Sequence, residues 1–471
     1  MKFNLMINDR QKMVLVIAYF FPPERNSGSI QSFNILKRLP QFNWKPIILT
    51  IKQKYLSSIS EEGELLLKSL PKESLLIRTN FIQPQQILMR IKKFFYPKAK
   101  SNKDINQNYK IDKKGKKGYF QKIKDFITDS LLAIPDKQIW WLPYAVLAGI
   151  DMNRRHKIDL IYAIGKPWTS FLIGYCLKKC IKKPLIINLM DPWMSYGSWE
   201  YKRTWMIEKI EEWIEKFIVK KVDFIVANTM ELKEDFIKRL RIKNEKIEVI
   251  TCGYEKTDFD NVDIEGKRED KFIITHTGTF YKKRLPINFL IALKELLEEK
   301  LIASDEILIN FVGRISPKYQ QVYDLMNEPH LKPIIKMYDW VPHKEAIEYF
   351  YQSDVLLLIQ PQTTLQIPAK LYEYAASGKP MIIIGEKNGA VANLIKKEGW
   401  GDIIEDNDFK CIKKVISEYY KQFKNKTLPT RINRKNIEKY EFNYLAKDLT
   451  QVFNKIYQDK DRDRDRDRDN G

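Results

Sequence analysis

The chain has 471 residues, of which 44% are hydrophobic and 12% aromatic, so it is long enough for two domains and too apolar to be disordered over most of its length. Lys and Arg number 82 against 60 Asp and Glu, which gives a formal net charge of +22. An excess of this size attracts polyanions, namely nucleic acid, anionic lipid surfaces or diphosphate substrates.

Strands alternate with helices through the first half of the chain. A β-branched apolar strand at 13–19 leads into a Pro-rich loop that contains Gly28, and a helical pattern follows. Alternation of this kind predicts a parallel sheet covered by helices. The other elements predicted here are strands at 46–50, 159–164, 184–189, 223–228 and 246–251 and helices at 169–180, 208–222 and 231–240.

An acidic, polar stretch at 255–270 interrupts this pattern and is interpreted as a linker. A strand from Phe272 then leads into a glycine loop at Gly278. Further elements are predicted as helices at 285–297, 343–352, 390–398 and 410–424 and strands at 307–312, 334–338 and 354–359. The predicted domains are therefore 13–254 with a basic insert at about 90–124, the linker 255–270, 271–434, a C-terminal helix at 435–458 and a disordered tail at 459–471.

The most informative segment is 366–384. It predicts a helix that contains one acid, Glu373, ends at Gly378 and is followed by a buried strand. Doubly wound sheets bind ligands beside their loops, and an acid placed there can bind ribose hydroxyls.

The cysteines and the apolar runs indicate where in the cell the protein is located. Cys176, Cys180, Cys252 and Cys411 form no Cys-x-x-Cys pair and have no histidine cluster nearby, which favours reduced thiols over disulfides or zinc. The apolar run 14–21 is too short to span a bilayer, which requires roughly 20 residues. We therefore expect a cytoplasmic protein, peripheral on the inner face of the membrane if the basic, aromatic insert binds anionic lipid. A solvated, lysine-rich loop is the open alternative for that insert.

Several motifs in order resemble the family 4 glycosyltransferases, in particular the capsule and lipopolysaccharide branch. They are Val16–Pro23 with Gly28, Trp44–Thr50, Asp191-Pro192-Trp193, His276–Thr279 with Arg284, and Ile367–Tyr374. The resemblance implies the α/β GT-B fold, in which two Rossmann-like, doubly wound parallel-sheet domains face a central cleft.

The resemblance also implies roles for individual residues. Glu373 would bind the ribose hydroxyls, Arg284 would act at the diphosphate, and Asp191 would orient the acceptor hydroxyl. The remaining residues implied to bind substrate are Gly28, Gly278, Thr279 and Lys370 at the phosphates, Trp340 and Val341 near the base, and Leu371 within the donor motif. Cations and backbone N–H groups would meet the charge of the leaving phosphate, so no metal and no cofactor beyond the sugar nucleotide is expected.

The chain departs from the family pattern at two positions that bear on the donor. Leu365 stands where the family usually has a second glutamate that contacts the donor sugar. Thr279 stands where it usually has an arginine after the loop glycine, so Arg284 alone remains of the usual cation pair. Each assignment also has a plain structural alternative: Glu373 as a solvated helix acid, Arg284 as part of a basic turn and Asp191 as a turn cap.

We therefore predict a retaining, metal-independent glycosyltransferase that moves a sugar from a nucleotide-diphosphate sugar to a glycan or lipid-linked acceptor in cell-surface polysaccharide synthesis. Two alternatives stay open: a UDP-sugar 2-epimerase-like GT-B enzyme, and a non-catalytic protein that binds sugar nucleotides or polyanions. Nucleic acid is not an expected partner, because the basic residues follow no recognised reading motif.

Overall fold

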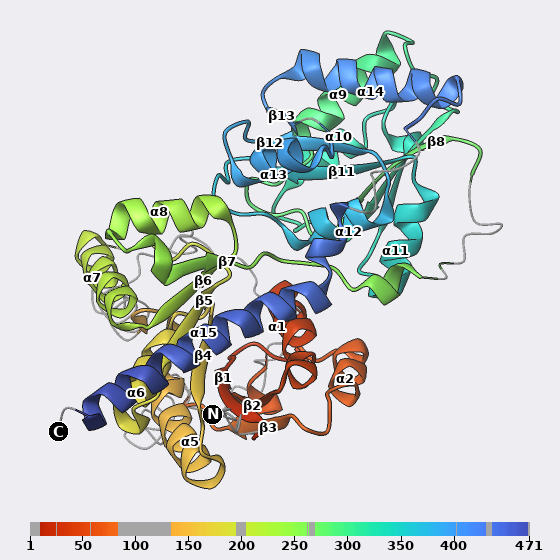
Figure 1. Cartoon of the computed structure of the whole chain (residues 1–471). Helices are drawn as coiled ribbons and strands as arrows, with labels where there is room; N and C mark the ends of the chain where they lie inside the picture. The colour runs from red at the N-terminus through yellow and green to blue at the C-terminus, as the bar shows by residue number, and fades with distance from the viewer. Residues whose placement is uncertain are drawn as a thin grey trace, which may run out of the picture. The chain divides into compact units, whose positions relative to one another are not determined.

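The computed structural model describes residues 10–24, 26–56, 58–82, 133–194, 204–260, 262, 269–401, 403–429 and 436–469. The basic insert at 90–124 lies outside these residues. The described chain divides into two compact units, one within 1–29, 43–225 and 453–471 and the other within 30–42 and 226–452 (Figure 1). The domain boundaries drawn from the sequence stay predictions.

The first sheet has seven parallel strands in the order β3-β2-β1-β4-β5-β6-β7. The central strands are runs of Ile, Leu, Val and Ala that are buried on both faces, as expected for a parallel sheet between layers of helices. The order 3-2-1-4-5-6 is that of a doubly wound fold. The strands are β1 (Lys12–Ile17), β2 (Trp44–Ile51), β3 (Leu75–Thr79), β4 (Leu160–Gly165), β5 (Leu185–Leu189), β6 (Phe224–Ala227) and β7 (Ile247–Val249).

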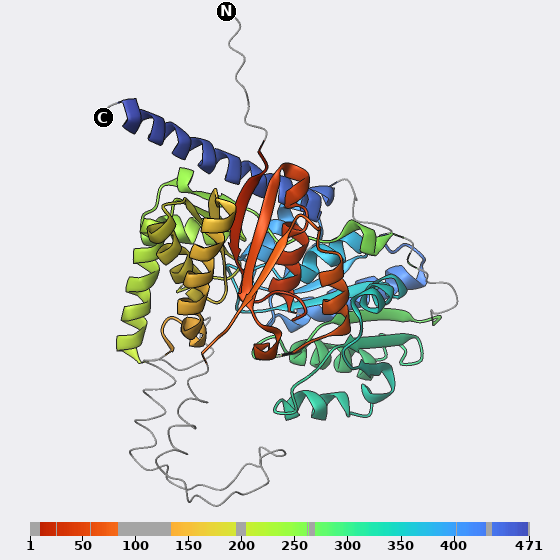
Figure 2. The same cartoon turned by 90° about the horizontal axis from the view of Figure 1, so that it is seen from below.

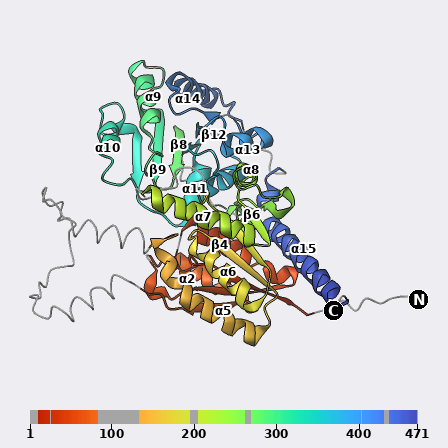
Figure 3. The same cartoon turned by 90° about the vertical axis from the view of Figure 1, so that its left-hand side faces the viewer.

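Three helices lie side by side over one face of this sheet (Figure 3). They are α5 (Leu142–His156), α6 (Thr169–Ile181) and α7 (Trp205–Lys221). The rings of Tyr175 on α6 and Phe217 on α7 meet edge to face, with centroids 5.2 Å apart. In this half of the chain the structure also describes α1 (Ser27–Leu36), α2 (Glu61–Lys68) and α8 (Met230–Leu240).

The second sheet has six parallel strands in the order β10-β9-β8-β11-β12-β13, which repeats the doubly wound pattern. The strands are β8 (Phe272–Thr277), β9 (Ile307–Val312), β10 (Ile335–Tyr338), β11 (Val355–Gln360), β12 (Met381–Gly385) and β13 (Ile403–Ile404). The prediction of two doubly wound parallel sheets is confirmed.

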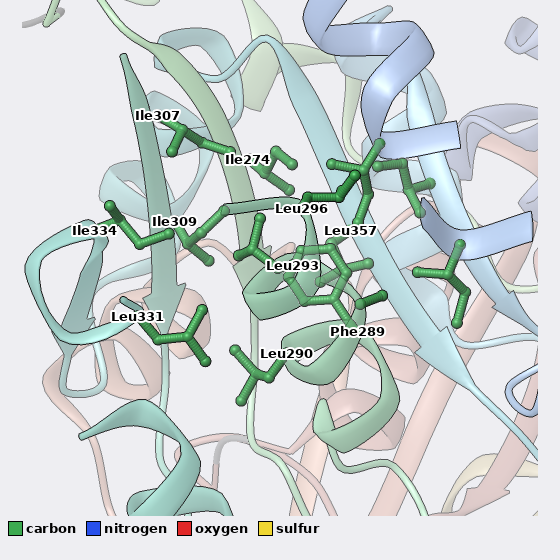
Figure 4. Packing of buried hydrophobic residues seen from close by; sticks show 14 of the residues in the cluster. Ile274, Phe289, Leu290, Leu293, Leu296, Ile307, Ile309, Leu331, Ile334 and Leu357 are labelled. Atoms are coloured by element: carbon green, nitrogen blue, oxygen red, sulfur yellow. The ribbon is translucent and has the colours of Figure 1, made fainter. Parts of the chain in front are cut away.

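Strand β11 shows how the core forms on both faces of this sheet. Leu357 points into the cluster under α9 (Ile287–Glu298), where Phe289, Leu293 and Leu296 pack (Figure 4). Its neighbour Leu358 belongs to the cluster on the opposite face, because successive side chains of a strand alternate. The other helices of this half are α10 (Gln320–Met326), α11 (His343–Gln352), α12 (Ala369–Ser377), α13 (Ala390–Glu398) and α14 (Phe409–Lys424).

The C-terminal helix differs from its prediction. A short 3₁₀ turn at Glu438–Tyr440 precedes α15, which runs as one helix over Phe442–Asp469 (Figure 2). The expectation of a disordered tail from residue 459 stays a prediction. Once a helix is nucleated, each further residue adds one hydrogen bond at small cost, and residues 442–469 contain no Pro or Gly.

Among the helices that the structure describes, none combines the length and the apolar character needed to cross a lipid bilayer.

Candidate functional site

Two glycines shape the loop that follows β8. Gly278 has φ +110° and Gly313, after β9, has φ +143°, a backbone region that disfavours other residues. A Cβ atom at Gly313 would lie 2.4 Å from the carbonyl oxygen of Gly278, and one at Gly278 would lie 2.5 Å from the Nζ atom of Lys370. The predicted glycine loop and the predicted lysine are therefore in close contact.

Helix α12 holds this loop through two side chains. The Tyr374 hydroxyl accepts a hydrogen bond from the backbone N–H of Thr277 at 3.0 Å, and Lys370 donates to the Thr277 carbonyl. Because residues 370 and 374 are one turn apart, both reach the end of β8 from the same side of the helix. Tyr374 was not among the predicted site residues.

The pKa of Lys370 is lowered in the folded protein. Burial, and after it the positive charge of Arg284, lower its pKa to about 8, while the carboxylate of Glu373 acts in the opposite direction. Lys370 thus lies within electrostatic reach of both residues that the sequence assigns to the two ends of a nucleotide diphosphate. Cationic side chains clustered at a glycine loop form a site suited to an anion.

Arg284 is held on its turn by an aromatic partner. Its Nη1 atom donates to the Tyr281 hydroxyl at 2.7 Å, and its guanidinium carbon lies 5.1 Å from the centre of the Tyr281 ring. The turn is closed by a bond from the backbone N–H of Arg284 to the carbonyl of Tyr281 at 3.0 Å. Thr279, on the same loop, is exposed.

Glu373 has a partner that the sequence analysis missed. Its Oε1 atom lies 3.0 Å from Nε2 of His343, the first residue of α11. Thirty positions separate the two residues in the chain, so no local pattern could have linked them.

The remaining predicted residues of this unit differ in accessibility. The Trp340 side chain is 51% exposed, and its backbone N–H donates to Asp339 at 2.6 Å. Val341 is half-buried. Leu371 is fully buried in the core under α12, so its side chain is not available to a ligand and any contact would come from its backbone.

His276, inside β8, is a buried structural histidine. Its Nδ1 atom lies 2.9 Å from the carbonyl oxygen of Leu357, and its ring stacks on Phe280 with centroids 4.2 Å apart. Burial lowers the pKa of His276 well below its usual value, so the ring is neutral at physiological pH.

Gly28 and the Asp191 loop lie together in the first unit. Gly28 is in the first turn of α1, where Asn26 accepts a hydrogen bond from the N–H of Ser29 at 2.8 Å. A Cβ atom at Gly28 would lie 3.9 Å from the sulfur of Met190, the residue before Asp191. The structure therefore brings these two predicted segments to one edge of the sheet, beyond the carboxyl ends of β1 and β5.

In the part of the chain that the structure describes, no group of three or more His, Cys, Asp or Glu side chains is arranged to hold a metal ion. The Asp-x-Asp spacing, which holds a divalent metal in some sugar transferases, occurs at 406–408. Here Asp408 caps α14 and accepts a hydrogen bond from the N–H of Cys411 at 3.1 Å.

Comparisons with known proteins agree with the motifs. Residues 120–257 match the model of Glycosyltransferase Family 4. A curated relative from Escherichia coli, UDP-Gal:alpha-D-GlcNAc-diphosphoundecaprenol alpha-1,3-galactosyltransferase, is 24% identical over 272 residues, which is 56% of this chain and 67% of the relative. These two matches support the prediction of a family 4 glycosyltransferase.

Solved structures show the same fold. Sucrose-phosphate synthase from Thermosynechococcus elongatus superposes with a TM-score of 0.65 at 14% identity and covers 95% of this chain and 99% of its own. HepE from Anabaena, solved in complex with UDP, superposes with a TM-score of 0.61 at 11% identity and covers 94% of this chain and 100% of its own. The chain therefore has the GT-B fold.

Proposed function

We propose that this glycosyltransferase moves a sugar from a nucleotide-diphosphate sugar to a glycan or lipid-linked acceptor. The observation that carries the proposal is the gathering of Lys370, Arg284 and Glu373 around the glycine loop after β8. Ammonium and guanidinium groups suit a diphosphate, and a carboxylate suits the hydroxyls of a ribose. The names of the Escherichia coli relative and of the Anabaena complex, which include UDP-Gal, a diphosphoundecaprenol and UDP, support this substrate class.

The chemistry follows from where charge develops. As the bond between C1 of the sugar and the β-phosphate oxygen breaks, negative charge builds on the leaving diphosphate, where Lys370 and Arg284 stabilise it. The acceptor oxygen forms the new bond to C1, and its proton passes to the leaving phosphate. Asp191 orients the acceptor hydroxyl. In this proposal the anomeric configuration is retained and the two cations take the role that a metal has in other transferases.

Donor recognition differs from the family pattern at Leu365. Its carbonyl oxygen accepts a hydrogen bond from the Thr229 hydroxyl at 2.8 Å, and its apolar side chain offers no acceptor to a sugar hydroxyl. Other polar groups must therefore select the donor sugar.

A screen of sugar nucleotides tests the proposal. UDP-, GDP- and ADP-sugars are compared by thermal shift, since a ligand that binds only the folded state raises its stability. A stabilising donor is then incubated with a diphospholipid-linked sugar, and we expect release of the nucleoside diphosphate together with a longer glycan. Conversion of the donor at C2 without an acceptor would favour the epimerase alternative, and stabilisation without turnover the binding protein.

We further propose that the enzyme works at the cytoplasmic face of the membrane in cell-surface polysaccharide synthesis. Helix α7 presents an apolar stripe, because Met206, Ile210 and Trp213 recur at helical spacing and are 66%, 39% and 64% exposed. Trp205, at the start of the helix, is 70% exposed. Exposed apolar patches of this kind mark interaction sites, and tryptophan favours membrane interfaces.

The positive charge near this apolar stripe favours an anionic lipid bilayer as its partner. Lys216 and Lys220 are exposed and lie one and two turns beyond Trp213 on an adjoining stripe. The basic segment at 90–124, predicted from the sequence to meet anionic lipid, adds to the same attraction.

A double replacement, Trp205→Ser with Trp213→Ser, is expected to lower the fraction of protein that pellets with anionic vesicles several-fold, because binding strength follows the apolar area buried in the interface. Leu65→Ser on α2 is the matched control, since Leu65 is 60% exposed and lies on another helix. Equal pelleting of the wild type with neutral and anionic vesicles, or no change in the double variant, would defeat the membrane proposal.

A further inference from the structure

His343 lies between two carboxylates of the second unit. Its Nε2 atom is 3.0 Å from Oε1 of Glu373, and its Nδ1 atom is 3.3 Å from Oδ2 of Asp258. Glu373 belongs to α12, and Asp258 belongs to the 3₁₀ turn Lys256–Phe259 in the segment interpreted as the linker. Three distant parts of the chain therefore meet at one imidazole ring.

This arrangement requires a charged ring. An imidazole donates a hydrogen bond from both nitrogens only when it is protonated, and both neighbours are acceptors. Burial opposes the charge, but the hydrogen bonds to Asp258 and Glu373 outweigh it and raise the pKa of His343 to about 10. His343 is therefore an imidazolium at neutral pH.

The consequence for Glu373 is a fixed carboxylate. A charge-assisted hydrogen bond to one oxygen restrains the rotation of the group. Asp258, on the far side of the ring, restrains the imidazole in turn. A carboxylate can accept up to about four hydrogen bonds, so the bond to His343 is compatible with further bonds to ribose hydroxyls.

We infer that His343 is a positioning residue for ribose recognition, which it serves by orienting Glu373 toward the two ribose hydroxyls of the donor. The inference rests on the proposed function, in which Glu373 binds these hydroxyls. Partly exposed ion pairs contribute little to stability. The side chains of His343, Glu373 and Asp258 are 29%, 22% and 36% exposed, so the main effect of the contact is on the direction of the carboxylate.

The inference is tested by removing the ring and the ribose hydroxyls separately. Calorimetry measures the affinity of the wild type, His343→Ala and His343→Gln for UDP and for 2′,3′-dideoxy-UDP, with GDP, ADP and their dideoxy forms in parallel. We expect the wild type to prefer the ribonucleotide, and His343→Ala to lose roughly tenfold or more of the affinity for it. The affinity of His343→Ala for the dideoxy form should stay unchanged. His343→Gln, which can keep a donor near the position of Nε2, should recover part of the loss.

Two further variants separate positioning from a general effect on the fold. Asp258→Asn removes the charge on the far side of the ring without touching Glu373, and we expect a smaller loss of the same ribose preference. His330→Ala is the matched control, because His330 also faces a glutamate, Glu298 at 3.8 Å, and is expected to change neither affinity.

The outcomes are distinguishable. Equal losses for the ribonucleotide and its dideoxy form in His343→Ala, or an unchanged ribose preference in both His343 variants, would overturn the inference and leave the proposed function standing. A wild type that binds both forms equally would contradict the ribose role of Glu373. A wild type that binds none of the three diphosphates would overturn the proposed function itself, and the inference with it.

Discussion

Replacing Lys370 with methionine is expected to reduce the affinity for a nucleoside diphosphate by about ten- to a hundredfold, the range for losing a hydrogen bond to a charged group. Methionine keeps an unbranched side chain as far as Cε and removes the ammonium that lies against Gly278. Because the folded protein without ligand already disfavours this charge, as its lowered pKa shows, the variant should lose little or no thermal stability. Calorimetry with UDP, GDP and ADP, and a melting curve without ligand, measure the two effects.

The pKa of Lys370 also predicts how the affinity for the nucleotide depends on pH. The pKa of Lys370 is about 8 in the free protein, and a bound anion must raise it. Above pH 8, binding therefore takes up a proton, and the dissociation constant should rise about tenfold per pH unit until the pKa of the complex is reached. Below pH 8 the lysine is already charged and contributes no slope. Lys370→Arg should bind without this dependence above pH 8, and an identical slope in that variant would exclude Lys370 as its source.

Replacing Glu373 with glutamine is expected to cost about ten- to a hundredfold in affinity for a ribonucleoside diphosphate and to remove the preference over the dideoxy form. Glutamine preserves the shape of the side chain but replaces a charged acceptor by a neutral one, so the bonds to ribose hydroxyls weaken. The variant also removes one of the two carboxylates that keep His343 protonated.

Competition calorimetry with the ribonucleotide and its dideoxy analogue measures this loss. Glu345→Gln is a suitable control, because Glu345 lies on α11 two residues after His343 and belongs to none of the predicted site residues. If Glu373→Gln weakens both nucleotides equally, or neither, the ribose assignment is wrong.

The sequence predicted the central strands of the sheets better than the edge strand β3 and helix α5. Runs such as 307–312 are apolar and rich in β-branched residues, and they became strands buried on both faces. Strand β3 was missed, because its Leu75–Thr79 run is half-buried and contains Arg78, whose side chain donates to two backbone carbonyls. Helix α5 was missed as well, because Trp140, Trp141 and Pro143 obscured the helical pattern at its start.

The part of the candidate site that lies within single local motifs could be predicted from the sequence. Gly278, Lys370 and Glu373 stand within recognisable loops and one helical turn, and in the structure Lys370 lies against Gly278 and feels the charge of Glu373. His343 and Tyr281 could not be found in this way. The partner of His343 lies 30 residues away and becomes its neighbour only when α11 packs beside α12, and Tyr281 acts through its hydroxyl on a turn whose basic residues dominated the pattern.

A crystal structure with UDP, or with whichever of UDP, GDP and ADP binds, would show whether Glu373, Lys370 and Arg284 bind one sugar nucleotide. We expect a single nucleotide whose ribose hydroxyls donate to Glu373 and whose β-phosphate contacts Lys370 and Arg284. A nucleotide bound elsewhere, or one that reaches Glu373 while both cations face away from its phosphates, would contradict this expectation.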